Sequence, residues 1–364
     1  MILSSGVNVF NKIYELPLSK DYVRHWGVVE AVRELFQNAL DSDSPFEYAI
    51  GASSLHISSR FSKLEPKTLL LGTTSKADCK DKIGSFGEGY KIALLVLSRE
   101  GRSVSIFNGD RVWTPEFRYS SQYEDEILCI KESKYPEGRG KGLVFVINDL
   151  SQSELEQIKS TNMHMWDKIG QIIETSYGRI LLDHPGKLFV NGLFVCETEF
   201  KYGYDVKPEF LKLERDRQTV SSFDLKWIAK DMWFETEQFE KIAFMISEEY
   251  PDMGYANYGT PALVKEACYQ LFIEQHPSSI VASSQSELKQ LVERGMQKVV
   301  YVGSSVYSES IRSSASYSEV VMPTLKSPTE KMDDWFKENR GHMRREAIVA
   351  FKALLEESQK WKLK

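Results

Sequence analysis

Apolar residues recur every three or four positions between Val28 and Asp41, which predicts an amphipathic helix that ends in the turn Ser42–Pro45. The run Tyr90–Leu97, which is apolar except for Lys91, predicts a second, buried helix. Alternating or apolar segments predict strands over 54–58, 103–108, 116–119, 126–130 and 143–147. Helix, strand, helix and then a run of strands is typical of an α+β sandwich, in which helices cover one face of a mixed sheet.

The rest of the chain predicts two further regions. Helical periodicity over 155–173 and 226–249 flanks three short strands, 179–182, 187–190 and 193–196, with Asn191-Gly192 as a hairpin turn between the last two. A linker over 255–261 precedes a helix at 286–294, a strand at 298–302, a Ser- and Tyr-rich loop at 304–318, and one or two charged helices over 329–362. We therefore expect three domains, residues 1–155, 156–255 and 256–364, the last an α/β and helical region.

Composition narrows the class of protein. The chain has 364 residues, 42% of them hydrophobic and 27% charged, with a formal net charge of −6. The charge argues against a nucleic-acid partner, although it leaves a local basic groove open. Apolar runs are too short for a membrane span, so we expect no membrane partner. The four cysteines are far apart, and we expect reduced thiols in a cytoplasmic protein, in the host cytoplasm if the protein is viral.

The first candidate site lies in the first predicted helix. Glu34, Asn38 and Asp41 stand at i, i+4 and i+7, and therefore on one helix face. A carboxylate there can activate a water, an amide oxygen one turn away can hold Mg²⁺, and Asp41 can order the surrounding waters. The alternative interpretation is the solvated polar face of a surface helix.

The second candidate site is the glycine-rich segment 83–91, which runs into the second predicted helix. Gly84, Gly87 and Gly89 permit close approach of the backbone to a ligand, and a helix N-terminus favours phosphate. A tight turn without a ligand is the alternative interpretation. The two segments in this order are more informative than either alone.

Together these segments resemble the GHKL ATPases (gyrase B subunit, ninety-kilodalton heat-shock chaperone, histidine kinases, MutL). Segment 33–41 resembles their N box, 83–97 resembles their second glycine box, and 71–76 resembles the start of the ATP lid, with the heat-shock chaperone nearest. The resemblance implies a Bergerat-type ATP-binding domain over residues 1–155, with ATP and Mg²⁺ as ligands.

The resemblance also implies roles for particular residues. Glu34 is the general base and Asn38 the Mg²⁺ ligand. The implied nucleotide-binding residues are Asn38, Asp41, Lys76, Gly84, Phe86, Gly87, Glu88, Gly89, Tyr90 and Lys91. Segment 211–217 is similar to the chaperone segment whose Arg reaches the γ-phosphate, which implies Arg215, or Arg217, as a second catalytic residue and a transducer-like domain over 156–255. An exposed charged loop is the alternative there.

The chain departs from the family on the adenine side. The family's Asp-x-Gly-x-Gly box is replaced by Ser58–Leu64, and Leu143 stands near the position of a supporting Thr. A missing partner for a buried amino group costs about 1–3 kcal/mol, unless Ser58 or Ser59 substitutes. ATP with altered contacts, a different nucleotide, or a degenerate pocket are the three outcomes left open.

The leading hypothesis is slow, Mg-dependent ATP hydrolysis that closes the lid and rearranges domains on a protein partner or client, with a homodimer as one option. The second hypothesis is a non-catalytic interaction protein with a degenerate nucleotide pocket. For the charged helices after 329, plain packing is favoured over a role in dimerisation.

Overall fold

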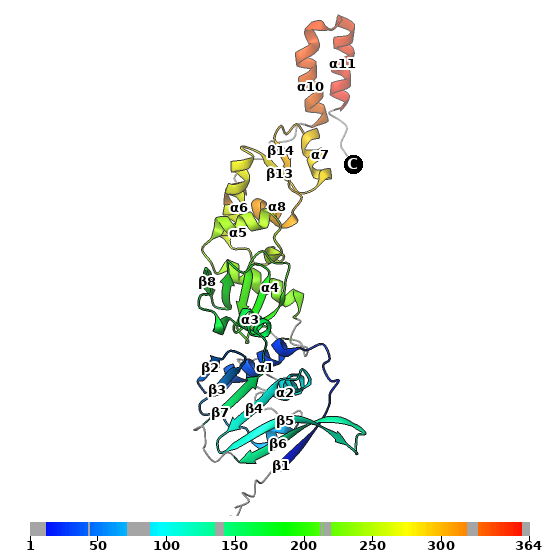
Figure 1. Cartoon of the computed structure of the whole chain (residues 1–364). Helices are drawn as coiled ribbons and strands as arrows, with labels where there is room; N and C mark the ends of the chain where they lie inside the picture. Colours follow the sequence, from blue (N-terminus) through cyan, green and yellow to red (C-terminus); the bar gives the residue numbers. More distant parts are fainter. Residues whose placement is uncertain are drawn as a thin grey trace, which may run out of the picture. The chain divides into compact units, whose positions relative to one another are not determined.

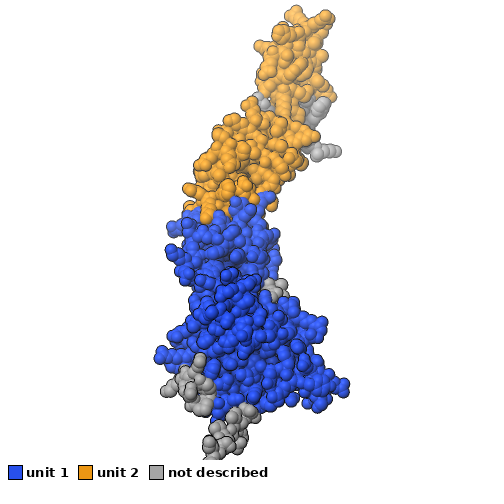
Figure 2. Space-filling model, viewed as in Figure 1, with its two compact units in different colours: residues 1–238, 249–255 blue, residues 239–248, 256–364 orange. Residues whose placement is uncertain are grey.

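We analysed a computed structural model, which describes residues 12–42, 44–70, 88–134, 142–211, 213, 220–318 and 327–358. The chain divides into two compact units, which Figure 2 shows in different colours. Unit 1 comprises residues 1–238 and 249–255, and unit 2 comprises residues 239–248 and 256–364. The three domains expected from the sequence stay a prediction.

Unit 1 begins with a seven-stranded sheet, as far as its described residues show, in the order β1-β6-β5-β4-β7-β3-β2. Its strands are β1 (Lys12–Ser19), β2 (Phe46–Ile50), β3 (Leu55–Ser59), β4 (Ser103–Asn108), β5 (Arg111–Ser120), β6 (Asp125–Lys134) and β7 (Leu143–Asn148). Every neighbouring pair is antiparallel, so the prediction of a mixed sheet is wrong here. Short turns join β2 to β3, β4 to β5 and β5 to β6, and such turns allow only antiparallel pairing.

Two helices pack against this sheet and carry the residues of the first two motifs (Figure 1). They are α1 (Val28–Leu40) and α2 (Gly89–Arg99), which contact each other, and α1 also contacts β3 while α2 contacts β4 and β5. Leu55 and Ile57 of β3 and almost the whole of α2 lie in this core. Two shorter elements complete this part of the chain. The 3-10 helix η1 (Pro66–Leu69) precedes α2, and α3 (Gln152–Ser160) follows β7, the last strand of the sheet in the sequence. The predicted α+β class is confirmed.

A second sheet in unit 1 has the order β11-β10-β12-β9-β8. Its strands are β8 (Ile172–Thr175), β9 (Gly178–Leu181), β10 (Lys187–Val190), β11 (Leu193–Glu197) and β12 (Gly203–Val206). The pair β10–β12 is parallel and the others are antiparallel. The predicted hairpin turn is confirmed, with φ values of 50° at Asn191 and 77° at Gly192.

Several predicted helices need correction. The helix expected over 155–173 ends at Ser160, and the 3-10 helix η2 (Met163–Met165) and strand β8 follow it. The helix expected over 226–249 is two helices, α4 (Ser222–Phe234) and α5 (Phe239–Ser247), and the 3-10 helix η3 (Pro251–Met253) comes next. In the second case both halves are apolar enough to pack, and the periodicity did not reveal the break between them.

Unit 2 combines helices with two short parallel strands. After α5 come α6 (Ala262–Gln275), β13 (Ile280–Ala282), α7 (Gln285–Glu293), β14 (Val299–Tyr301), α8 (Ser305–Arg312), α9 (Ala315–Ser318), α10 (Pro328–Asn339), the 3-10 helix η4 (Arg340–His342) and α11 (Arg345–Ser358). The prediction of a loop over 304–318 is wrong, because α8 and α9 lie there. The side chain of Ser304 caps α8, and Tyr307, Ser308 and Ile311 of this helix are buried. Over the described residues, no helix has the length and apolar character needed to cross a membrane.

Candidate functional site

Several polar side chains on α1 and directly after it are buried rather than solvated. Glu34 has an exposed fraction of 0% and Asp41 of 4%, and Asn38 between them is half-buried. Gln37, which the sequence analysis did not single out, is also buried. A carboxylate inside a core loses its hydration, which costs several kcal/mol per ion. A buried carboxylate is therefore retained only where this cost is compensated by other contacts or where the group has a function. The interpretation as a solvated surface face therefore does not fit α1.

A hydrogen bond within α1 holds the nitrogen end of the Asn38 amide. Its Nδ2 donates a hydrogen bond to the backbone oxygen of Glu34 at 2.7 Å, one turn earlier on the same helix. The nitrogen is thus held by the helix, and the carbonyl oxygen is the end that suits a hard cation. Among the described residues, no group of three or more His, Cys, Asp or Glu side chains gathers in a metal-type cluster. Asn38 would be the protein's main contribution to an Mg²⁺ site, whose other ligands would be phosphates and waters.

Arg33 connects this region with the second sheet. Its Nη2 lies 3.7 Å from Glu34 Oε1, and its Nη1 donates to the backbone oxygen of Phe194 in β11 at 3.4 Å. The guanidinium therefore lies between the buried carboxylate and a strand of the other sheet in unit 1. Arg33 thus connects Glu34 with β11 through polar contacts.

The start of α2 is held by buried polar contacts with η1. Lys91 has an exposed fraction of 0%, and its Nζ donates to the backbone oxygens of Thr68 at 2.9 Å and Leu70 at 2.5 Å. The hydroxyl of Tyr90 donates to the same Thr68 oxygen at 2.8 Å. Burial lowers the pKa of Lys91 and raises the pKa of Tyr90 to about 12. In the structure both side chains anchor η1 to α2; their predicted contact with phosphate stays a prediction.

Of the remaining residues that were predicted to bind the nucleotide, some are among the described residues and others are not. Glu88 precedes α2 and Gly89 begins it, so the first backbone amides of α2 follow the glycine motif directly. Lys76, Gly84, Phe86, Gly87, Arg215 and Arg217 lie outside the described residues. The structure therefore places Glu34 and Asn38 on α1 and Asp41 directly after it, and α1 packs against α2, which Gly89 begins.

The two departures on the adenine side lie next to each other. Ser59 is the last residue of β3 and Leu143 the first of β7, and they are direct partners in the antiparallel register. Both are buried, and Ser59 shares the helix-facing side of β3 with Leu55 and Ile57. Ser58 points to the other side, where its hydroxyl donates to the backbone oxygen of Glu47 at 3.2 Å. Of the two serines, Ser59 is therefore the one on the buried, helix-facing side of the sheet.

Comparisons with known proteins leave the family open. The chain matches no model of a known protein family. It is 26% identical over 222 residues to an uncharacterized protein of Mycoplasma pneumoniae, an alignment that covers 56% of this chain and 89% of that protein. This chain is therefore distantly similar to a mycoplasmal protein across most of that protein's length.

Proposed function

We propose that this protein binds ATP with Mg²⁺ at the α1–α2 region of unit 1 and hydrolyses it slowly, as a GHKL-type ATPase with a Bergerat-type domain. The observation that carries the proposal is the burial of polar side chains on α1 and directly after it: Glu34 and Asp41 are buried, and Asn38 between them is half-buried. The motif resemblance to the GHKL ATPases supplies the reaction, and the burial supports a role for these side chains beyond solvation of a helix.

Each described residue has a role in this proposal. Glu34 accepts a proton from the attacking water, because a positioned carboxylate is a group that can act as a general base. Asn38 would hold Mg²⁺ through its carbonyl oxygen, and the metal would neutralise phosphate charge. The first amides of α2 would bind the phosphates, because the dipole of a helix favours negative charge at its N-terminus. Lys76, Gly84, Phe86, Gly87 and Arg215, outside the described residues, keep the roles that the resemblance implies.

The base of the nucleotide contacts the paired strand ends of β3 and β7 in this proposal. Ser59 has a hydroxyl, which accepts one hydrogen bond from an adenine amino group and can share a water with it. The neutral hydroxyl replaces a charged acceptor, so we expect weaker binding than with an Asp, by about tenfold to a hundredfold. A weak, slow enzyme in the cytoplasm, where ATP is abundant, agrees with this arrangement.

Nucleotide binding acts on a protein partner through a change of conformation in this proposal. Arg33 contacts both Glu34 and the Phe194 carbonyl of β11, so a rearrangement at the phosphate reaches the second sheet. This second sheet then serves as the transducer.

A second candidate function rests on the adenine side alone. Ser59 and Leu143 replace the two groups with which the family recognises adenine, and a non-catalytic interaction protein with a degenerate pocket accounts for their loss. It predicts that no Mg-nucleotide raises the thermal stability of the protein.

The test is steady-state ATP turnover of three proteins: wild type, Glu34→Gln and Glu30→Gln. Glu30 is the matched control, because it lies on the same helix one turn earlier and its Oε2 accepts a hydrogen bond from the backbone of Gly27 at 2.9 Å. We expect Glu34→Gln to lower turnover by about a hundredfold or more and to keep nucleotide affinity, while Glu30→Gln retains turnover. Equal turnover in wild type and Glu34→Gln would overturn the assignment of the base.

A further inference from the structure

The segment that follows β3 is held against the end of the helix that carries the proposed Mg²⁺ ligand. Residues 60–65 connect β3 with η1, and their first two backbone N–H groups hydrogen-bond to the chain shortly after α1. Arg60 donates to the backbone oxygen of Pro45 at 3.2 Å, and Phe61 donates to the hydroxyl of Ser44 at 2.8 Å. The start of the segment is therefore fixed near the C-terminal end of α1.

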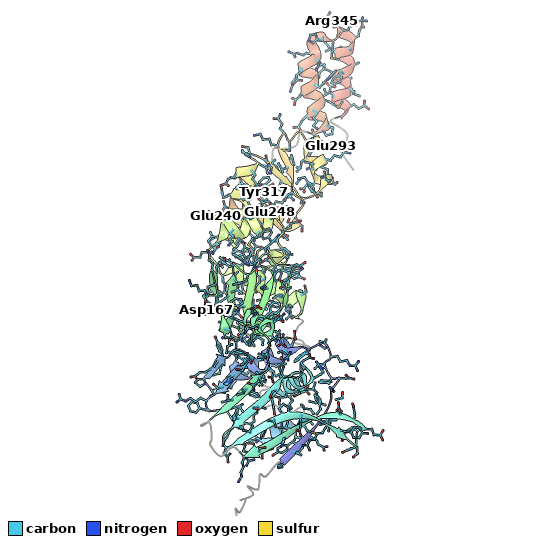
Figure 3. All side chains as sticks on the ribbon, in the orientation of Figure 1. Asp167, Glu240, Glu248, Glu293, Tyr317 and Arg345 are labelled. Carbon is cyan, nitrogen blue, oxygen red and sulfur yellow. The ribbon has the colours of Figure 1, made fainter. Side chains whose placement is uncertain are left out.

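The rest of this segment crosses the ends of two further strands. Asn108, the last residue of β4, is buried; its Nδ2 donates to the backbone oxygen of Leu64 at 2.6 Å, and its Oδ1 accepts from the backbone N–H of Leu64 at 3.2 Å. At Gly142, directly before β7, a Cβ would lie 2.7 Å from the backbone oxygen of Arg60. The segment therefore runs from α1 across the ends of β3, β7 and β4 to η1, which contacts the start of α2; Figure 3 draws the side chains there.

The polar side chains of this segment are mainly hydrogen-bond donors. No Asp, Glu, Asn or Gln occurs over residues 55–64, whereas Arg60 and Lys63 bring two exposed cations. Glu65, the next residue, is already paired with Lys67 at 2.7 Å. Arg60 and Lys63 are therefore the charged side chains that this part of the chain can offer to a ligand.

Phe61 provides a surface on which a base can stack. Its exposed fraction of 74% is the highest of the large apolar side chains in the described part of the chain. The Arg60 guanidinium has its Cζ 5.9 Å from the centre of this ring, and among the described residues it forms no hydrogen bond or ion pair. Nucleobases stack on aromatic rings and on guanidinium planes, and such stacking tolerates every base. Phe61 therefore accounts for the binding of a base, and the choice of base depends on hydrogen bonds.

The hydrogen-bonding groups favour one purine over the other. Guanine presents two acceptors, O6 and N7, on one edge, to which an Arg guanidinium can donate two hydrogen bonds. Adenine presents N7 and an amino donor on this edge, so the same guanidinium would meet a donor. The GHKL motif has an Asp, which only accepts, at the position of Ser59; in this chain a serine hydroxyl, which suits either base, is followed by Arg60. The change from an acceptor to donors favours guanine.

We propose that the nucleotide site of unit 1 takes guanine nucleotides in preference to adenine nucleotides, with the base stacked on Phe61 and its O6 and N7 bound by Arg60. The inference rests on the proposed function, because it assigns the base of the nucleotide whose phosphates would lie at α1 and α2. A bidentate contact of this kind discriminates between bases by about tenfold to a hundredfold. Slow hydrolysis at this site would then act mainly on GTP.

The experiment is isothermal titration calorimetry of the full chain with Mg-GTP, Mg-ITP and Mg-ATP. Inosine triphosphate has the O6 and N7 of guanine and lacks its 2-amino group, so we expect GTP and ITP to bind wild type about equally and at least tenfold more tightly than ATP. Arg60→Met should remove this preference. Arg118→Met is the matched control, because Arg118 is also exposed and lies on β5 of the same sheet; it should keep the preference.

Phe61→Ala separates stacking from the choice of base. We expect this variant to bind all three nucleotides roughly tenfold more weakly and to keep the preference for GTP and ITP. ATP bound as tightly as GTP by wild type, ITP bound as weakly as ATP, or a preference that survives in Arg60→Met would overturn the inference and leave the nucleotide site standing. Binding of none of the three nucleotides would overturn the proposed function and the inference together.

Discussion

The residues of α1 show how much of a site depends on its surroundings. The spacing of Glu34, Asn38 and Asp41 along one face could be predicted from the sequence, because helix periodicity alone decides it. Their burial could not be predicted, since it depends on α2 and the sheet that pack around them. Gln37 was missed for the same reason: a buried amide on a helix gives no signal in the sequence until its neighbours are known.

Lys91 gives a prediction on pH dependence. Burial lowers the pKa of its ammonium in the folded protein, below the value of about 10.4 for a free lysine, while the charge of Glu88 opposes this shift to a smaller extent. Between the two pKa values the unfolded chain binds more protons, so the free energy of unfolding rises with pH across this window. We therefore expect the unfolding free energy of wild type minus that of Lys91→Met to increase as the pH is raised toward about 10.4. Urea unfolding at several alkaline pH values measures it, and a flat or falling difference contradicts the buried ammonium.

At the scale of elements, two strands of the second sheet come very close to each other at Gly178. Gly178 in β9 has a φ of 143°, and a Cβ there would lie 2.1 Å from the backbone oxygen of Asp205 in β12. Gly101 also has a positive φ, 75°, but a Cβ there meets nothing within 4 Å. We expect Gly178→Ala to lower the free energy of unfolding by at least about 2 kcal/mol more than Gly101→Ala, because only the first change forces two strands apart. Equal losses in denaturant unfolding would show that the contact is unimportant.

The elements that the sequence predicted are those with a clear periodic signal. α1, α2 and most strands of the first sheet were found, since each has one face in the core. β2 was missed because it is an edge strand, exposed along most of its length. α8 was missed because Ser308 and Ser310 are buried, whereas serines normally indicate a loop. The sequence showed only that Ser59 and Leu143 differ from the residues of the GHKL motifs; the strand register was needed to show that the two are direct partners.

At the scale of the whole molecule, nucleotide binding should act on unit 1 first. We expect Mg-ATP to slow amide hydrogen exchange in α1 and α2 and, through Arg33, in β11, and to leave α6 and α8 of unit 2 unchanged. In Arg33→Ala, the protection of β11 should be lost while that of α1 and α2 remains. Hydrogen exchange followed by mass spectrometry resolves these segments. Protection confined to unit 2 would contradict the location of the site.

The central claim, that α1 carries a nucleotide site, is tested most directly by thermal unfolding with a panel of Mg-nucleotides. The variant is Asn38→Ala, and its matched control is Asn339→Ala, because Asn339 Nδ2 makes the same hydrogen bond to a carbonyl one turn earlier, that of Trp335 at 2.9 Å, in α10. We predict that Mg-ATP, or another Mg-nucleotide if the base preference has changed, stabilises wild type and Asn339→Ala by several degrees and Asn38→Ala by much less. Stabilisation of none of the three proteins by any Mg-nucleotide would contradict the account.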